Sequence, residues 1–336
     1  MIGRALCALA AVSLLACGAC GSTTLDAGSD RPQGPLPVDE RDPLILSNDG
    51  PYDNWDGEYA LVLASAGKIN LVGIVVNSSI IYPNLADNVQ GWRDMVQAAR
   101  ASGMRNIPDP TASVDDPPLQ PPANGDIEST APNHSEGGRL IVDAVHRLGQ
   151  PLRPIVVATG GRLTEVADAY LLDPSIADEV VVVSSLGQVS PDATTATMSE
   201  PNGDLDPWAD EIVARKFRFV QVVAYYAQQD DIPSAKIADI PANAFRTWIA
   251  SKIPQIFPFP AHQASDQNSV IACAFPDFPL DIVRMSELSP TPPPAGMTPT
   301  LGQSAGGNSW IVTKANNALA SERFWQALTD PTTYGP

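Results

Sequence analysis

The sequence is poor in basic residues and in histidine. Its 336 residues include 20 Lys and Arg against 38 Asp and Glu, so the formal net charge is −18, and there are 3 His. A protein that binds nucleic acid needs a basic surface to neutralise phosphates, so this composition argues against a nucleic-acid partner. The hydrophobic content of 44% is that of a soluble globular protein, and the length allows one large domain or two smaller ones.

Cysteine is scarce, and most of it lies near the N-terminus. Of 4 Cys, only Cys273 falls in the body of the chain, inside the apolar run VIACAF. A lone cysteine in such a run is most simply a small buried hydrophobic residue. We therefore do not expect Cys273 to act as a nucleophile.

The sequence has no apolar run long enough to cross a bilayer. The N-terminal run ALCALAAVSLLA is about a dozen residues long, as in the apolar region of an export signal. It leads into Leu14-Leu15-Ala16-Cys17, which resembles the bacterial lipobox, with Cys20 as a second candidate for lipidation. The sequence thus predicts a lipoprotein signal peptide over residues 1–16, lipidation of Cys17 and a membrane anchor in the bacterial cell envelope. An ordinary secretory signal is the alternative.

Residues 17–42 are small, polar and rich in proline, and we expect a flexible tether there. From residue 43 to 336, apolar runs alternate with helical patterns, which is typical of an α/β protein. Because the predicted strands are apolar throughout, we expect one domain with an open, mainly parallel sheet and helices on both faces. The predicted strands are 43–49, 69–79, 153–161, 177–187, 217–226 and 309–315. The predicted helices are 59–66, 88–103, 136–149, 163–173, 206–216, 268–275 and 320–330. The Pro-rich segment 107–133 is expected to be a functional or disordered loop.

Two common nucleotide-binding motifs are missing. The turn ATGGRL after the strand at 153–161 has neither the GxGxxG spacing of a dinucleotide site nor the GK[ST] of a P-loop. Ligands of open parallel sheets nevertheless bind at the carboxyl ends of strands. Those ends carry the polar clusters SNDGPYDNWD, VVNSS, ATGG and SSLGQ.

The first of these clusters is the most acidic. Asp49, Asp53, Asp56 and Glu58 follow one strand within a single turn, and crowded carboxylates repel one another unless water or a cation neutralises them. Ca²⁺ takes several oxygen ligands of this kind, although the spacing is not that of an EF-hand. A solvated turn with helix-capping side chains is the alternative.

Five segments, in order, resemble the inosine–uridine-preferring nucleoside hydrolase family. The family's DxDPGxDDA turn, helix and LVGIT strand are matched by residues 44–77, with extra residues inside the turn. Its PTGPLTNIA, AEFN, HDP and ERFW segments are matched in 158–187, 199–213, 264–275 and 320–328. The similarity runs from residue 43 to residue 330 and is weakest across 78–134. It implies a Rossmann-like nucleoside hydrolase fold.

The resemblance also implies roles for individual residues. Asp49 matches a metal-binding Asp that also accepts a proton from the attacking water. Thr159 matches the Thr whose backbone carbonyl binds Ca²⁺, and Asp266 matches a late metal-binding Asp. The residues matching substrate contacts are Asn77, Glu200 and Asn202.

Two positions depart from the family pattern. The adjacent Asp pair is Asp56-Gly57 here, so Asp56 is the preferred metal and ribose ligand, with Asp53 and Glu58 as alternatives. The family's late His is Ser265, and His262 is the nearby candidate for an acid that protonates the leaving base. Trp55 and Trp208 are candidates to stack on a base or a sugar, with ordinary packing as the alternative.

The expected function is hydrolysis of the N-glycosidic bond of a ribonucleoside, or of a related glycoside, by a Ca²⁺-activated water. The alternative is a non-catalytic surface lipoprotein that binds a nucleoside or a sugar. The family is often dimeric or tetrameric, so a homo-oligomer is possible, but no interface is evident in the sequence.

Overall fold

The structure is a computed structural model that describes residues 35–51, 55–113, 118–149, 153–222, 229–256, 261–264, 266–287 and 297–335. Of residues 56, 229–235, 253–256 and 261–264 only the backbone is described. The chain divides into residues 1–30 and 31–336, and the description below concerns the second unit. The predicted signal peptide, Cys17 and Cys20 lie outside the described residues.

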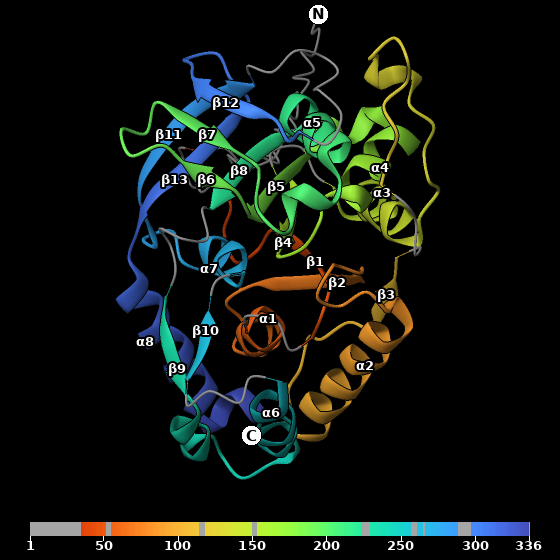
Figure 1. Ribbon diagram of the computed structural model, residues 1–336. Coiled ribbons are helices and arrows are strands. Elements are labelled where there is room, and N and C mark those ends of the chain that lie inside the picture. The colour runs from red at the N-terminus through yellow and green to blue at the C-terminus, as the bar shows by residue number, and fades with distance from the viewer. Residues whose placement is uncertain are drawn as a thin grey trace, which may run out of the picture. The chain divides into compact units, whose positions relative to one another are not determined.

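Within the described residues, the centre is an eleven-stranded sheet with the order β3-β2-β1-β4-β5-β8-β13-β11-β12-β7-β6 (Figure 1). The first seven strands in this order, from β3 at the edge to β13, are parallel to one another. Strands β11, β12, β7 and β6 join them through antiparallel pairs. A separate hairpin pairs β9 with β10. The strands are β1 Pro43–Asn48, β2 Asn70–Val76, β3 Pro110–Ala112, β4 Ile155–Thr159, β5 Val180–Ser185, β6 Gln188–Val189, β7 Thr195–Thr197, β8 Arg218–Val222, β9 Gln229–Pro233, β10 Ala261–Ala264, β11 Pro279–Glu287, β12 Thr300–Gln303 and β13 Ser309–Ala315.

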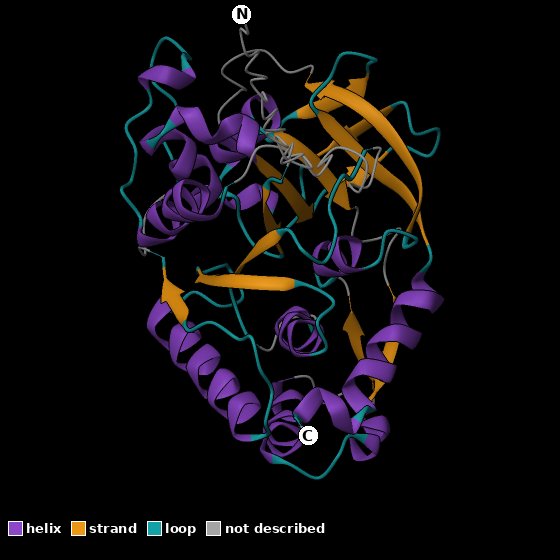
Figure 2. Ribbon diagram, turned by 180° about the vertical axis from the view of Figure 1, so that it is seen from behind, coloured by secondary structure: helices purple, strands orange, loops and turns teal. Residues whose placement is uncertain are grey.

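Helices cover both faces of the parallel strands (Figure 2). They are α1 Asp56–Ser65, α2 Leu85–Ala101, α3 Glu136–Leu148, α4 Thr164–Leu172, α5 Pro207–Lys216, α6 Ala244–Ile256, α7 Asn268–Ala274 and α8 Asn317–Thr329, with 3₁₀ turns at η1 Ile127–Ser129, η2 Pro174–Glu179, η3 Gly203–Leu205, η4 Ser234–Asp239 and η5 Pro331–Tyr334. Several helices begin at side-chain caps. The Asn84 side chain accepts hydrogen bonds from the amides of Ala86 and Asp87, and the Ser135 hydroxyl accepts one from Gly138.

The core consists of two apolar layers, one on each face of the sheet. In β1, Leu44 and Leu46 join the layer under α1, α2 and α7, whereas Ile45 joins the layer under α3, α4 and α5. Successive side chains of a strand point to opposite faces, so a strand covered on both sides must be apolar at every position. The expected α/β architecture is confirmed.

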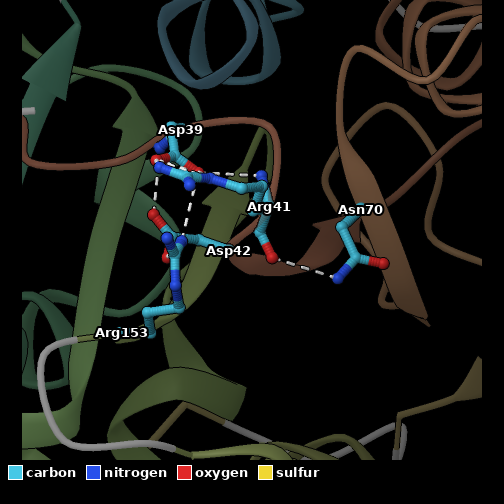
Figure 3. Close-up of polar contacts among 5 residues, drawn as sticks. All are labelled: Asp39, Arg41, Asp42, Asn70 and Arg153. Carbon is cyan, nitrogen blue, oxygen red and sulfur yellow. Dashed lines mark hydrogen bonds and ion pairs between the residues drawn. The ribbon is translucent and has the colours of Figure 1, made fainter. Parts of the chain in front are cut away.

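The N-terminal segment 35–42 belongs to the folded unit (Figure 3). Val38 is buried, and the Arg153 guanidinium contacts the carboxylates of Asp39 and Asp42 at 3.2 and 3.1 Å. The Arg218 guanidinium donates to the carbonyl of Pro35 at 2.8 Å. The tether predicted over 17–42 is therefore wrong at its C-terminal end, because residues 35–42 pack against the starts of β4 and β8.

The Pro-rich segment predicted over 107–133 is held to the domain at several buried residues. It contains β3 and η1, and Leu119 and Ile127 are buried. The amide of Leu119 donates to Asp206 and the Trp208 indole donates to Thr130, which ties the segment to the start of α5. The alternative of a disordered loop is wrong for these residues; residues 114–117 lie outside the described ranges.

The predicted strands and helices are present in order. Strands β2, β4 and β5 are shorter than predicted, whereas α1, α2 and α8 each begin three residues earlier than predicted. The sequence analysis missed the antiparallel strands β6, β7, β9, β10, β11 and β12, as well as β3 and α6. Most of the missed strands have two to four residues and little apolar character. Within the described part of the chain, every helix is too short or too polar to cross a membrane.

Candidate functional site

Polar side chains gather at the carboxyl ends of β1, β2, β4 and β5. After β1 the chain moves outward to β2 and β3, and it then returns to place β4 on the other side of β1. The crevice at such a reversal of strand order is the usual ligand site of an open parallel sheet. Asp49 follows β1, Asn77 follows β2 and Thr159 ends β4, so all three lie at this edge.

The pairing of the strands brings these residues together. Ser47 of β1 lies opposite Thr159 of β4, and the amide of Asn77 donates to the carbonyl of Asn48 at 2.8 Å. The Thr159 hydroxyl and the Ser184 hydroxyl of β5 are 2.5 Å apart. The strand ends thus form one continuous polar edge across β2, β1, β4 and β5.

Asp49 is the central residue of this edge. Its side chain is buried, the Trp92 indole donates to its carbonyl at 3.1 Å, and the Ser79 hydroxyl donates to its carboxylate. Burial raises the pKa of Asp49 to about 6, against the opposing effect of the Ser79 and Gly50 hydrogen bonds. The second carboxylate oxygen, Oδ1, is buried without a hydrogen-bond partner. One oxygen is therefore held by the protein, and the other is left for a ligand.

Glu200 lies close enough to Asp49 to feel its charge. Glu200 Oε1 accepts hydrogen bonds from the amides of Asn202 at 2.8 Å and Gly203 at 3.1 Å. Burial raises the pKa of Glu200 to about 7, and repulsion from Asp204 and Asp49 adds to this. The Asn202 side chain donates to the carbonyl of Ser185 at 3.5 Å, so residues 200–202 sit over the end of β5.

The side chain of Asn77 is positioned by contacts with β1 and α4. Its Nδ2 lies 3.4 Å from both the Ser47 hydroxyl and Glu165 Oε2, and its Oδ1 is buried without a partner. A Cβ on Gly161 would lie 3.0 Å from that Oδ1, so the turn after β4 requires a glycine to approach this closely.

Asp266 is buried and lies two residues before α7, next to the N-cap residue Gln267. Helix α7 packs against α1, β4 and β5, so the residues that lead into α7 lie near strands that carry the candidate site. The neighbouring side chains of Gln267 and Asn268 are fully buried, and the polar atoms at the ends of both have no hydrogen-bond partner.

Several predicted residues cannot be placed by their side chains. Asp53, Ser265 and Cys17 lie outside the described residues, and only the backbone is described for Asp56, at the start of α1, and for His262, opposite Ile232 in the β9–β10 hairpin. Glu58, an alternative to Asp56, is fully buried within α1.

The two candidate stacking tryptophans are packing residues. Trp55 is 1% exposed and meets the Phe324 ring edge to face at 6.2 Å. Trp208 is buried against the Pro-rich segment through Thr130. The stacking role is therefore wrong for both. Trp55 still shapes the site, because it caps α1 in the left-handed conformation (φ 66°), which few non-glycine residues adopt.

The structure adds polar residues that the sequence analysis did not single out. They are Asn48, Ser79, Arg162, Glu165, Gln267 and Asn268, and all but Ser79 have buried polar atoms without a hydrogen-bond partner. Their common signal in the sequence is a polar side chain just beyond an apolar strand or beside a predicted ligand. The sequence analysis noted the polar clusters at the strand ends but gave roles only to residues that match the family pattern or lie in the acidic turn.

The oxygen donors fit a hard cation such as Ca²⁺ in kind. Asp49 has a free buried oxygen, and Asp266 and the Thr159 carbonyl supply only oxygen, which is what Ca²⁺ prefers. Across the described residues, no three His, Cys, Asp or Glu side chains come together to hold a metal ion. A further carboxylate would have to come from the turn that carries Asp53 and Asp56.

No protein-family model and no curated protein matches the chain. Its structural neighbours are nucleoside hydrolases. The purine-preferring ribonucleoside hydrolase from Gardnerella vaginalis matches with a TM-score of 0.60 at 16% identity, over 87% of this chain and 99% of that one. A plant nucleoside hydrolase gives 0.59 at 13% over 86% and 99%, and an inosine-guanosine nucleoside hydrolase gives 0.59 at 16% over 87% and 100%. At these identities the likeness shows a shared fold.

Proposed function

We propose that the protein hydrolyses the N-glycosidic bond of ribonucleosides, or of a closely related glycoside. The observation that carries the proposal is Asp49, a buried carboxylate with one free oxygen at the strand-order reversal of a fold shared with nucleoside hydrolases. The sequence resemblance places the family's catalytic Asp at the same residue.

The proposed roles of Asp49, Glu200 and Asn202 follow from where their side chains lie, and those of Asp56, Asn77 and His262 come from the sequence analysis. Asp49 Oδ1 accepts the proton of the attacking water, because it is free while Ser79 holds the other oxygen. Glu200 and Asn202 hold ribose hydroxyls beside the end of β5. Asp56 and Asn77 are proposed as further substrate contacts, and His262 as the acid that protonates the leaving base.

Ca²⁺ is proposed as the cofactor, with Asp49, Asp56, Asp266 and the Thr159 carbonyl as its ligands. When bound, it would lower the pKa of a water molecule and neutralise the acidic edge. Binding of this kind would also relieve the repulsion that raises the pKa of Glu200.

The test is ribose release from a panel of purine and pyrimidine nucleosides with Ca²⁺ present. We expect turnover by the wild type, a loss of at least ~100-fold in Asp49→Asn because the proton acceptor is removed, and weaker Ca²⁺ binding by calorimetry. Asp143→Asn, in an exposed position of α3, is the matched control and should behave as wild type. No release from any nucleoside would refute the proposal.

One observation favours a second candidate, a surface protein that binds a nucleoside or sugar without cleaving it. The described residues supply no cluster of three metal-ligating side chains, and a metal held by so few ligands would bind weakly. Saturable nucleoside binding without ribose release would select this candidate.

Export and lipid anchoring are proposed from the N-terminal sequence alone. We expect the full chain in the membrane fraction of a bacterial host, and Cys17→Ser in the soluble fraction. Cys20→Ser is the control, because it leaves the preferred lipidation site intact.

A further inference from the structure

Arg162 is a buried arginine whose hydrogen-bonding capacity is largely unused. It lies in the turn between β4 and α4 and is only 6% exposed. Its Nε and Nη2 atoms are buried, and neither has a hydrogen-bond partner among the described residues. Buried polar groups are almost always hydrogen-bonded, and a buried charge needs a partner most of all.

The two free atoms are a matched pair. The N–H bonds of Nε and of Nη2 point in parallel from one edge of the planar guanidinium, and this edge fits the two oxygens of a carboxylate or a phosphate. A water molecule offers one oxygen to the two donors, whereas an oxyanion offers an oxygen to each donor and also neutralises the positive charge of the guanidinium.

The acidic residues next to Arg162 do not occupy this edge. Asp206 uses its oxygens for the Thr164 hydroxyl at 2.6 Å and for the amides of Leu119 and Ala209 at 3.0 and 3.1 Å. Glu165 accepts from Asn77 and Ser113. The charge of Arg162 opposes the burial that raises the pKa of both carboxyls, so they are near, but neither lies within ion-pair distance of it in the described structure.

The N-terminus of α4 adds to the same site. Leu163, the residue at the cap position, gives this nine-residue helix no side-chain hydrogen bond, so its N-terminal amides are left available beside the Glu165 carboxyl of the first turn. Arg162 directly precedes it and is in turn close to Thr159 and to Gly161, which abuts Asn77. A group bound here would border the candidate active site.

We propose that Arg162 and the N-terminus of α4 bind an oxyanion, a phosphate or a carboxylate, carried by the substrate. That the bound group is part of a substrate rests on the proposed function. The favoured substrates are then anionic nucleosides rather than neutral ones. Arg162 is then a specificity-determining residue, because it distinguishes substrates by a charge remote from the bond that breaks.

The first experiment measures binding without turnover. Thermal unfolding of the full chain is followed against inorganic phosphate, and separately against acetate, at constant ionic strength. We expect a saturable rise in melting temperature for the wild type with one of the two anions, loss of that rise in Arg162→Gln and at least a tenfold weaker response in Arg162→Lys, which keeps the charge but not the parallel donors. Arg139→Gln, on the exposed side of α3, is the control and should respond as wild type.

Arg162→Lys keeps the test decisive if Arg162→Gln does not fold. A wild type that responds to neither anion, or a lysine variant that responds as strongly as wild type, would overturn the proposal, and the buried edge would then hold only water.

The second experiment identifies which anionic group of the substrate, a phosphate or a carboxylate, the site binds. Wild type and Arg162→Lys are compared on inosine against inosine 5′-monophosphate, and on uridine against orotidine, which carries a carboxylate on the base. We expect one anionic member to be preferred and its preference over the neutral member to fall at least tenfold in the variant. Anion binding without turnover of any nucleoside would refute the proposed function and leave the anion site standing, whereas turnover of neutral nucleosides without an anion response would refute the anion site alone.

Discussion

Asp49 and Glu200 show how burial sets the chemistry of single residues in this protein. Their pKa values rise from 3.8 to about 6 and from 4.5 to about 7, first because both carboxyls are removed from water. For Glu200, the nearby charges of Asp204 and Asp49 add to the shift. Both carboxyls are costly to ionise, and they lie near enough at the strand ends to interact electrostatically. A cation or a substrate bound there would offset the free-energy cost of ionising them.

This arrangement predicts the pH dependence of stability. Glu200 loses its proton near pH 4.5 when unfolded but only near pH 7 when folded, so the free energy of unfolding falls as the pH rises through this window. In a chelating buffer we expect Glu200→Gln to remove the part of that fall that Glu200 causes, while the raised pKa of Asp49 still produces a fall up to about pH 6. The variant should gain about 3 kcal/mol over wild type at pH 8, with no gain at pH 4.

Denaturant unfolding at several pH values provides the measurement. Glu40→Gln, at an exposed position, is the control and should follow the wild-type curve. Equal gains for Glu200→Gln at pH 4 and pH 8 would contradict the explanation, because they would show that the effect is not one of charge.

At the scale of elements, Asp206 joins three parts of the fold. One oxygen caps α5 through the amide of Ala209, and the other accepts from Thr164 at the start of α4 and from Leu119 in the Pro-rich segment. The position of α4, and with it of Arg162, depends on this residue. The cap of α5 is therefore also a tertiary contact.

We expect Asp206→Ala to lower the free energy of unfolding by about 3 kcal/mol, because it removes a helix cap and leaves two further buried donors unpaired. Asn84→Ala is the control. It removes the cap of α2 at an exposed position and should cost about 1 kcal/mol. Similar losses in the two variants, measured by denaturant unfolding, would show that the links to α4 and to Leu119 contribute nothing.

At the scale of the whole folded unit, the segment 35–42 fixes where the chain enters the domain. Its contacts with Arg153, shown in Figure 3, and with Arg218 lie at the starts of β4 and β8. The candidate site lies at the opposite ends of the same parallel strands. Residue 35, where the described part of the chain begins, therefore lies at the end of the sheet away from the site.

Two truncations test the contribution of this segment. Removal of residues 1–34 should leave the melting curve and the denaturant midpoint unchanged. Removal of residues 1–42 should cost about 3 kcal/mol, because the buried Val38 side chain and the partners of Arg153 are lost. Identical stabilities for the two truncated proteins would place the domain boundary at residue 43, as the sequence alone predicted.

Much of the fold follows from local patterns. Runs such as LIL and VVVV are apolar at every position, which is typical of strands covered on both faces, and the helices between them carry the periodicity of packed surfaces. The short antiparallel strands β6, β7 and β12 were missed because two to four residues hold too little pattern. Their conformation is decided by tertiary pairing, of β12 with β11, of β7 with β12 and of β6 with β7.

The candidate site was likewise predictable from the sequence only in part. The sequence by itself determined the parallel α/β architecture and the acidic turn after β1, because burial periodicity and clusters of like charge are properties of neighbours along the chain. Only the tertiary structure decided that Glu200 feels the charge of Asp49, that Trp55 and Trp208 are packing residues and that Arg162 has an unused pair of donors. Burial, charge coupling and missing hydrogen-bond partners depend on residues that the fold brings together from distant parts of the chain.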